Sequence, residues 1–241
     1  MPIEINALET RRFGLTCAKR TDLSAPLSDV NAAARAQGVQ MISTRIAVGD
    51  LAQVHALEDD GYRLMDALVY YGRTFDANWS EPQARHDYTL RLASAADADA
   101  VAQVSRAAFT GYLGHYHIDL RLDSAQADAA YVEWAENSVR HMSGDDKVMI
   151  ALDGDTVVGF VALRRNTYEQ FELVLNGVHP AYQRLGIYSS LVARALSVAR
   201  EKDAAEVIVS TQINNYAVQK VWVRLGMHHQ SSYYTFHKWF D

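Results

Sequence analysis

The chain has 241 residues, of which 49% are hydrophobic and 22% are charged, and its formal net charge is −6. This composition is that of an ordinary globular protein, and it excludes a chain that is disordered throughout. The acidic balance argues against a general nucleic-acid or anionic-membrane surface, although a few backbone amides and arginines can still hold a phosphate.

The single cysteine, Cys17, cannot form an internal disulfide, so a reducing compartment is favoured. The first residues contain no apolar signal core, and no run of about 18 apolar residues occurs in the sequence. We therefore expect a cytoplasmic protein that does not associate with membranes. The sequence leaves the oligomeric state open, a homodimer included.

The first 76 residues alternate strand and helix patterns. Strands are predicted at 13–19, 39–46 and 62–71, and helices at 28–37 and 51–59. Asp50 is expected to cap the second helix, and Gly38 and Gly61 to end the two helices. Residues 1–76 are thus predicted to be a small βαβαβ domain, thin for an independent core. Residues 77–87 are polar, contain Pro82 and are predicted to form a linker.

A longer α/β domain is predicted over residues 88–241. Strands are expected at 88–92, 147–152, 156–164, 171–178, 206–213 and 231–239, and helices at 97–109, 124–141, 184–202 and 216–225. The turn Asp153-Gly154-Asp155 indicates a hairpin between two of these strands.

The most informative stretch is the predicted strand that ends at Pro180 and the turn that follows it. The turn and the first helical residues are Gln183, Arg184, Leu185, Gly186, Ile187 and Tyr188. Free N–H groups at such a turn point into one concavity, and the helix dipole adds about half a positive charge there. Gly186 would let the backbone approach a ligand closely. The pattern therefore predicts a pyrophosphate site.

This stretch resembles the acyl-coenzyme A signature of the GNAT acetyltransferase superfamily: a strand, a Val-x-Pro step, then Gln/Arg-x-x-Gly-x-Gly/Ala opening a helix. The chain departs from it at the last small residue, where it has Tyr188. The resemblance implies acetyl-coenzyme A as co-substrate, contacted by Val178 and residues 183–188. It also implies the GNAT fold, a mixed and mostly antiparallel central sheet flanked by helices, with residues 1–76 as a smaller, partial GNAT-like domain.

A second part of the resemblance is the spacing of Asn215, Trp222 and Gly226. Seven residues return to the same helix face, so Asn215 and Trp222 are predicted to contact the coenzyme together. Two other interpretations stay open: Asn215 as a helix cap and Trp222 as core. The family often has a tyrosine at position 222 that serves as the acid for the leaving thiol. Tryptophan cannot surrender a proton near neutral pH, so the acid is not identified.

In the family an amine attacks the thioester directly. A backbone N–H of the splayed strand, placed at Val178, would polarise the carbonyl. The attacking amine must also lose a proton, through a carboxylate, a histidine or water. Glu172 on the strand and His179 at its end are the candidate bases, although a strand-surface glutamate is usually only solvated.

The acceptor side resembles the dTDP-fucosamine acetyltransferase group, which acetylates a nucleotide-linked 4-amino-4,6-dideoxy sugar. His117, Asp119 and Arg121 match its loop motif, and Trp134 and Asn137 match its helix motif. The resemblance implies that these five residues bind the acceptor. Alternatively, His117 and Asp119 order the loop and Trp134 is core. No Cys/His spacing indicates a metal site.

The sequence therefore predicts an acetyl-coenzyme A-dependent N-acetyltransferase for an amino sugar, nucleotide-linked, with no nucleic-acid partner. Two alternatives remain: an acetyltransferase for another small amine, amino acid or protein N-terminus, and a non-catalytic acyl-coenzyme A-binding module.

Overall fold

The computed structural model describes residues 1–76, 79–80 and 88–240, and it divides into two compact units. The first comprises Met1–Val69, Leu113–Ala127 and Ser231–Asp241, and the second comprises Tyr70–Tyr112 and Asp128–Gln230. Contacts therefore divide the chain differently from the boundaries at 76 and 88 suggested by the sequence. Most of the predicted linker, residues 77–87, lies outside the described residues, which include only Trp79 and Ser80 of it.

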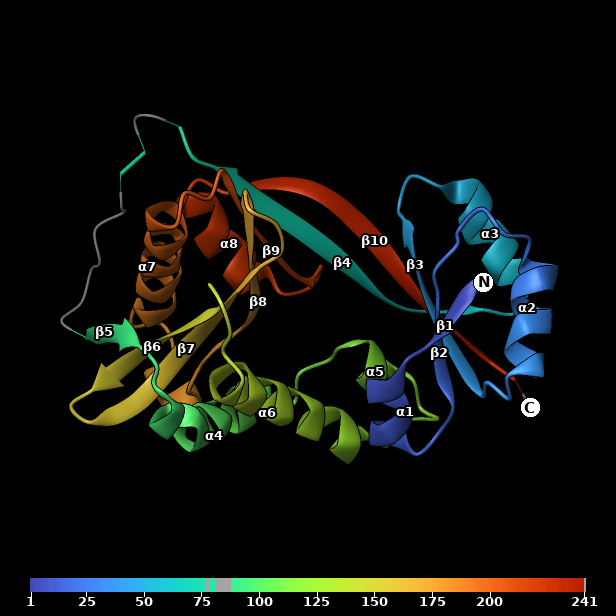
Figure 1. Ribbon diagram of the computed structural model, residues 1–241, viewed down its shortest axis with the longest axis horizontal. Coiled ribbons are helices and arrows are strands. Elements are labelled where there is room, and N and C mark those ends of the chain that lie inside the picture. Colours follow the sequence, from blue (N-terminus) through green and yellow to red (C-terminus); the bar gives the residue numbers. More distant parts are fainter. Residues whose placement is uncertain (77–78, 81–87, 241) are drawn as a thin grey trace. The chain divides into compact units, whose positions relative to one another are not determined.

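The first unit is a small sheet with helices on both faces (Figure 1). Its strands follow the order β1-β2-β3-β10, in which β2 and β3 are parallel and the other two pairs are antiparallel. The elements are β1 (Ile3–Ile5), α1 (Ala7–Phe13), β2 (Cys17–Arg20), α2 (Leu27–Ala36), β3 (Met41–Ala47), α3 (Leu51–Asp59), β4 (Arg63–Thr74), α5 (His115–Ile118) and β10 (His228–Trp239). The strands β4 and β10 continue into the second unit.

Alternation along the strands explains the two covered faces. Ala18 and Ile42 pack with helices α2 and α3, whereas their neighbours Cys17 and Met41 pack on the opposite side with Phe13. The strands β2 and β3 therefore bury side chains on both faces.

The second unit contains the strand order β9-β8-β7-β6-β5, with a parallel β8–β9 pair and antiparallel pairs elsewhere. This is the mixed, mostly antiparallel sheet that the sequence predicted. Its elements are β5 (Thr89–Leu92), η1 (Ala95–Asp97), α4 (Ala98–Phe109), α6 (Ser124–Arg140), β6 (Lys147–Asp153), β7 (Thr156–Arg165), β8 (Gln170–Val178), η2 (Pro180–Tyr182), α7 (Ile187–Glu201), β9 (Glu206–Gln212) and α8 (Tyr216–Arg224).

Two apolar clusters cover the faces of this second sheet. Helices α7 and α8 pack on the face that includes Met149 and Leu173, and α4 and α6 pack on the face that includes Ile150 and Leu175. The functional elements, β8 and the start of α7, thus rest on a fully packed sheet. Among the described residues, no helix combines the length and apolarity needed to cross a bilayer.

Two sequence predictions need correction. The strand expected at 13–19 begins only at Cys17, because α1 runs to Phe13, capped by the Asn6 side chain at 3.2 Å and ended by Gly14 at φ +64°. The helix expected from residue 184 begins at Ile187, because Arg184 and Gly186 have φ values of +66° and +82°. By contrast, the predicted cap of α3 is present: Asp50 accepts a hydrogen bond from the Gln53 N–H at 3.2 Å.

Candidate active site

The end of β8 has an edge that the neighbouring strand leaves uncovered. The parallel ladder to β9 pairs Gln170–Leu173 with Glu206–Val209 and, in the described sheet, goes no further. The His179 N–H donates to the Val158 carbonyl of β7 at 2.9 Å. Because successive N–H groups in a strand point to opposite edges, the N–H groups of Val178 and Asn176 point away from β7. They therefore face the side where β9 has diverged.

The turn after β8 leads into a helix whose first N–H groups have no side-chain cap. Gly186 is the N-cap residue of α7 at φ +82° and ψ −5°, and no side chain accepts a hydrogen bond there. The left-handed backbone at Arg184 turns the chain just before it. Exposed N–H groups and a positive dipole end are what an anion needs, so this segment fits a phosphate group.

Gln183 links this turn back to β8, because its amide nitrogen donates to the Val178 carbonyl at 3.3 Å. Asn215 is the N-cap residue of α8, yet its side chain makes no cap hydrogen bond and instead donates to Thr211 Oγ1 at 3.1 Å. The alternative interpretation of Asn215 as a side-chain helix cap is therefore wrong. Asn215, on the segment that follows β9, therefore does not cap α8 through its side chain.

Trp222 is buried in the core of the second unit. Its side chain is 1% exposed, and its ring packs against Tyr71 with centroids 5.5 Å apart. The indole N–H donates to Tyr188 Oη at 2.9 Å, and the Tyr188 hydroxyl donates to Asn176 Oδ1 at 2.9 Å. Trp222 is therefore core, the alternative that the sequence left open, and Asn215 and Trp222 do not present one shared face to a ligand.

The Tyr188 hydroxyl is enclosed by this network. Burial raises the pKa of Tyr188 above that of an ordinary phenol, and the hydrogen bond from Trp222 acts in the opposite direction. The phenol is consequently protonated at neutral pH.

Glu172 is a poor candidate base. Its carboxylate pairs with the Arg164 guanidinium at 2.7 Å and accepts from the Asn166 amide at 3.1 Å. It also lies in the part of β8 that pairs with β9, six residues before Val178, or about 20 Å along the strand. A single amine cannot contact both groups, so Glu172 and Val178 do not form one site.

His179 lies beside the open edge, but one of its nitrogens is engaged. Its Nδ1 accepts a hydrogen bond from the Ala181 N–H at 3.3 Å, as the cap of η2. In a neutral imidazole whose Nδ1 is the acceptor, Nε2 carries the hydrogen and cannot take up a proton. His179 could accept a proton only at the expense of this cap.

The predicted loop residues lie in the first unit. Asp119 is 5% exposed, and its carboxylate accepts from His237 Nδ1 at 2.7 Å, from Trp239 Nε1 at 2.9 Å and from the Arg121 N–H at 3.1 Å. His117 Nδ1 accepts from the Gly114 N–H at 3.3 Å. The Arg121 guanidinium lies 4.2 Å from the Trp239 ring centroid. Asp119 thus organises its own unit, and His117 also orders the local chain.

Trp134 and Asn137 lie in the second unit, one turn apart on α6, and both are exposed. Trp134 is 43% exposed, so the alternative that it is core is wrong. An exposed indole with an amide beside it can stack on and hydrogen-bond a polar ring.

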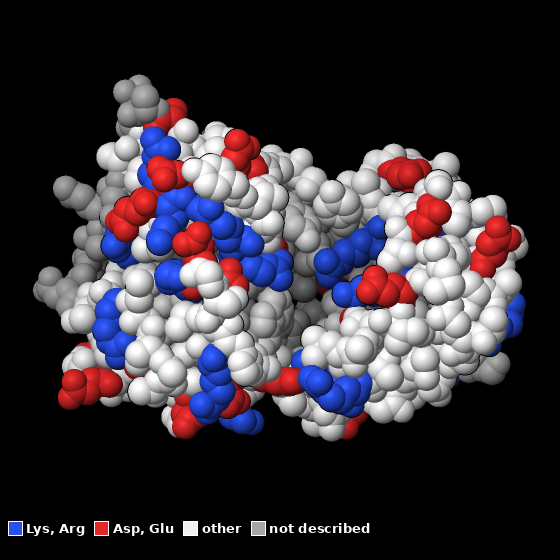
Figure 2. Space-filling view, viewed as in Figure 1, with Lys and Arg blue, Asp and Glu red and all other residues white. Residues whose placement is uncertain are grey.

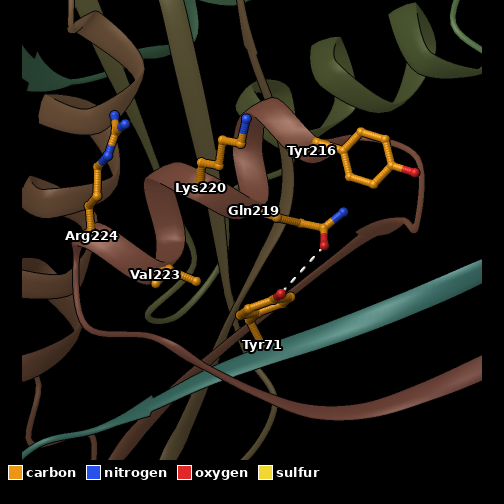
Figure 3. Close-up of a pocket in the computed structure, with 6 residues that line it drawn as sticks. All are labelled: Tyr71, Tyr216, Gln219, Lys220, Val223 and Arg224. Atoms are coloured by element: carbon orange, nitrogen blue, oxygen red, sulfur yellow. Dashed lines mark hydrogen bonds between the residues drawn. The ribbon is translucent and has the colours of Figure 1, made fainter.

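The helix α8 also borders an open hollow of about 390 Å³ (Figure 3). Tyr71 of β4 contributes its ring, and its hydroxyl lies 3.4 Å from Gln219 Oε1. The other lining residues belong to α8: Tyr216, Gln219, Lys220, Val223 and Arg224. On the face shown in Figure 2, acidic and basic side chains are intermingled. Among the described residues, no three His, Cys, Asp or Glu side chains are placed to share a metal ion.

Sequence reasoning missed Asn176 and the coupling of Tyr188 to Trp222. Asn176 is the one polar side chain between Leu173 and Val178, which was a usable signal. The residues Tyr188 and Trp222 are 34 positions apart, so their contact could not be inferred from local spacing.

Comparisons with known proteins agree with this geometry. The model of the acetyltransferase (GNAT) family matches residues 109–227. The spore coat polysaccharide biosynthesis protein SpsD of Bacillus subtilis (strain 168) is 24% identical over 144 residues, 59% of this chain and 48% of SpsD. The chain thus spans about half the length of this curated relative.

Solved structures share the fold over nearly the whole chain. A GCN5-related N-acetyltransferase from Sphaerobacter thermophilus has a TM-score of 0.67 at 15% identity, covering 98% of this chain and 76% of that one. A functionally unknown conserved protein from Staphylococcus epidermidis has a TM-score of 0.69 at 16% identity, covering 100% and 92%. A tandem GNAT protein from the clavulanic acid biosynthesis pathway has a TM-score of 0.64 at 12% identity, covering 94% and 76%. The chain belongs to the GNAT acetyltransferase family, a family of acyl-coenzyme A-dependent N-acetyltransferases.

Proposed function

We propose that this protein transfers the acetyl group of acetyl-coenzyme A to the amine of an amino sugar, a nucleotide-linked 4-amino-4,6-dideoxy sugar. One observation carries the proposal: the uncovered edge of β8 at Val178 leads directly into the uncapped start of α7. The edge offers N–H groups to a thioester and its amide-containing arm, and the helix start offers N–H groups to a diphosphate.

The residues proposed to hold the coenzyme are Val178, the segment from Gln183 to Tyr188, and Asn215. The N–H groups of Asn176 and Val178 are two residues apart on one edge, or about 7 Å, which suits two successive carbonyl groups of an extended ligand. Gln183 fixes the end of this edge through the Val178 carbonyl. Trp222 is left out of the set because it is buried.

When bound, the coenzyme supplies an acetyl thioester, whose carbonyl carbon is the electrophile. The Val178 N–H would donate to the carbonyl oxygen and stabilise the negative charge that develops there. Water is the proposed proton acceptor for the attacking amine, since the contacts of Glu172 and His179 occupy the groups that they would need.

The acceptor class is supported by two independent points. SpsD, a relative at 24% identity, is named for polysaccharide biosynthesis. Trp134 and Asn137 match the helix motif of the amino-sugar group and are exposed together on α6. We propose that they contact the acceptor, whereas the contacts of Asp119 favour a role in folding.

Release of the free thiol tests the proposal directly. We expect turnover with a dTDP-4-amino-4,6-dideoxy sugar and little with a polyamine or a peptide N-terminus. Faster turnover with the polyamine or the peptide would show that the acceptor class is wrong, while the acetyl transfer itself would stand. Coenzyme binding without turnover on any amine would favour the non-catalytic module.

The cellular setting is part of the proposal. Cys17 is a free thiol, which suits the reducing cytoplasm. It is also fully buried, and burial raises its pKa to about 12, so the thiol stays protonated at neutral pH. We also propose that the first unit is a partial GNAT-like domain, which the match to a tandem GNAT protein supports. Fractionation of cells and a search for modified Cys17 by mass spectrometry test the compartment.

A further inference from the structure

The two positions at which the sequence departs from the acyl-coenzyme A signature are in direct contact. Tyr188 stands where the signature has a small residue, and Trp222 stands where a tyrosine is usual. Trp222 Nε1 lies 2.9 Å from Tyr188 Oη. Because an indole N–H can only donate, the phenolic oxygen is the acceptor. Helix α8 has no tyrosine hydroxyl at position 222, but α7 has one at position 188. Trp222 holds that hydroxyl through its indole N–H.

The Tyr188 hydroxyl contacts a side chain of the part of β8 that lies beyond the β8–β9 pairing. Its own hydrogen is directed at Asn176 Oδ1, 2.9 Å away. Asn176 lies beyond the last β8 residue that pairs with β9, and two residues before Val178. Tyr188 itself is in the first turn of α7. One phenol therefore connects the edge proposed for the thioester with the turn proposed for the diphosphate.

We propose that Tyr188 is the catalytic hydrogen-bond donor to the departing sulfur, and that Trp222 is the positioning residue that holds its oxygen. This inference rests on the proposed function. The Tyr188 O–H turns from Asn176 to the sulfur while its oxygen keeps the hydrogen bond from Trp222. As the C–N bond forms, the C–S bond breaks with its electron pair going to sulfur. The proton released by the nitrogen reaches the sulfur through water, which completes the thiol.

A hydrogen bond, rather than full proton transfer, follows from the acidity of the two groups. A thiol has an ordinary pKa of about 8.5, and the pKa of Tyr188 is raised by burial above that of a free phenol. A phenolate at this position would therefore be less stable than the thiolate. The protonated phenol remains available as a donor over the whole neutral and mildly alkaline range.

Binding measurements at pH 9 give the contribution of the coenzyme sulfur to affinity without any turnover. Coenzyme A and desulfo-coenzyme A are titrated by calorimetry into the full-length protein and into Tyr188→Phe. The wild-type protein should bind coenzyme A about tenfold more tightly than the desulfo compound, and Tyr188→Phe should bind both alike. Tyr182→Phe, in the preceding turn, is the matched control and should keep the preference. Equal preference in wild type and Tyr188→Phe would overturn the inference.

Kinetics with the best acceptor gives the second test. Tyr188→Phe should lower kcat by about 100-fold with little change in the KM for acetyl-coenzyme A. Trp222→Phe should lower kcat by a few fold and weaken the preference for coenzyme A over its desulfo form. The double variant Tyr188→Ala/Trp222→Tyr restores a hydroxyl on α8 and should recover part of the rate lost in Tyr188→Ala. An unchanged kcat in a folded Tyr188→Phe would contradict the role.

The two proposals fail in different ways. If neither coenzyme A nor its desulfo form binds, the proposed function is wrong. If both bind equally to the wild-type protein, the coenzyme site stands and only the role of Tyr188 is wrong.

Discussion

One buried polar network in the first unit and one in the second differ in where they end. In the first unit, Asp119 accepts from His237 and Trp239, and His237 is 0% exposed. In the second unit, Trp222 donates to Tyr188, which donates to Asn176 on an uncovered strand edge. The first network contains a buried carboxylate, whose burial would be costly without hydrogen-bond partners. The second is uncharged and ends at Asn176, which lies beyond the residues of β8 that pair with β9.

This contrast teaches that the environment of a polar residue decides its role more than its type does. A His, an Asp and an Arg in one loop resemble a binding motif, yet Asp119 is committed to the fold of its unit. A tyrosine and a tryptophan resemble core residues, yet their hydroxyl and N–H groups form the hydrogen-bonded pair that we propose to act on the coenzyme sulfur.

The largest effect is expected for Gly186→Glu. A side chain at φ +82° costs about 1–2 kcal/mol, and a carboxylate at the start of α7 repels phosphate groups. Coenzyme A should bind at least ~100-fold more weakly by calorimetry.

Gly154→Glu is the matched control for that variant. Gly154 also has a positive φ, +57°, and open space around a Cβ, but it lies in the turn between β6 and β7. Its coenzyme affinity should be that of the wild type. Similar losses in both variants would show that backbone strain, and not the position at α7, lowers the affinity.

The next effect tests the first network. His237→Ala removes a donor to the buried Asp119 carboxylate, and the free energy of unfolding should fall by about 3 kcal/mol. Urea denaturation measures this change. His228→Ala, an exposed histidine on the same strand β10, should change it by less than about 0.5 kcal/mol. Coenzyme affinity of the folded His237→Ala protein should be unchanged, since the coenzyme residues lie in the second unit. A large loss of coenzyme affinity would show that the first network also affects the coenzyme site.

The pH dependence of stability should also come from the first network. Burial, then the neighbouring charges, lowers the pKa of His115 well below 6.5, and its Nδ1 lies 3.1 Å from His237 Nε2. Below pH 6.5 the unfolded chain therefore takes up a proton at His115 that the folded chain does not. Stability should fall by at most about 1.4 kcal/mol per pH unit as the pH drops below 6.5, until the folded pKa is reached. The charged or titratable groups that act on His115 are His237, Arg45, Lys19 and His117.

His115→Asn should flatten this slope in urea titrations between pH 5 and pH 7. Asp119 contributes only at lower pH: burial raises its pKa, but the hydrogen bonds from His237 and Trp239 outweigh that effect and leave the pKa below its ordinary value. Its stabilisation is therefore present above pH 3.8 and is lost as the pH falls through the folded pKa. An undiminished slope in His115→Asn would assign the pH dependence to another group.

The sequence predicted those features that depend on local spacing. The cap at Asp50, the β6–β7 hairpin and the strand-to-helix turn at Gly186 each involve residues within a few positions of one another. The order of elements in the second unit followed from apolar periodicity, and the family followed from the signature after β8.

The remaining features depend on contacts that no local pattern encodes. Asp119 and His237 are 118 residues apart, and Tyr188 and Trp222 are 34 apart. The short helix α1 was missed because seven residues give too little periodicity to distinguish it from a strand. Glu172 was a candidate base because it is a carboxylate on the strand before the turn. Its ion pair with Arg164 could not be foreseen, because the register of β7 and β8 was unknown.

The smallest effect is expected for substitutions at the two ends of β8. Gln183 donates to the Val178 carbonyl at the uncovered end, and Gln170 donates to Glu206 at the end that pairs with β9, at 2.8 Å. Each substitution by alanine removes one neutral or charge-assisted hydrogen bond. Gln183→Ala should weaken coenzyme A binding about fivefold, because the edge loses the contact that fixes its end, at a typical value of about 1 kcal/mol. Gln170→Ala should leave binding unchanged and lower only stability. If Gln170→Ala weakens binding as much as Gln183→Ala does, the uncovered end of β8 is not where the coenzyme is held.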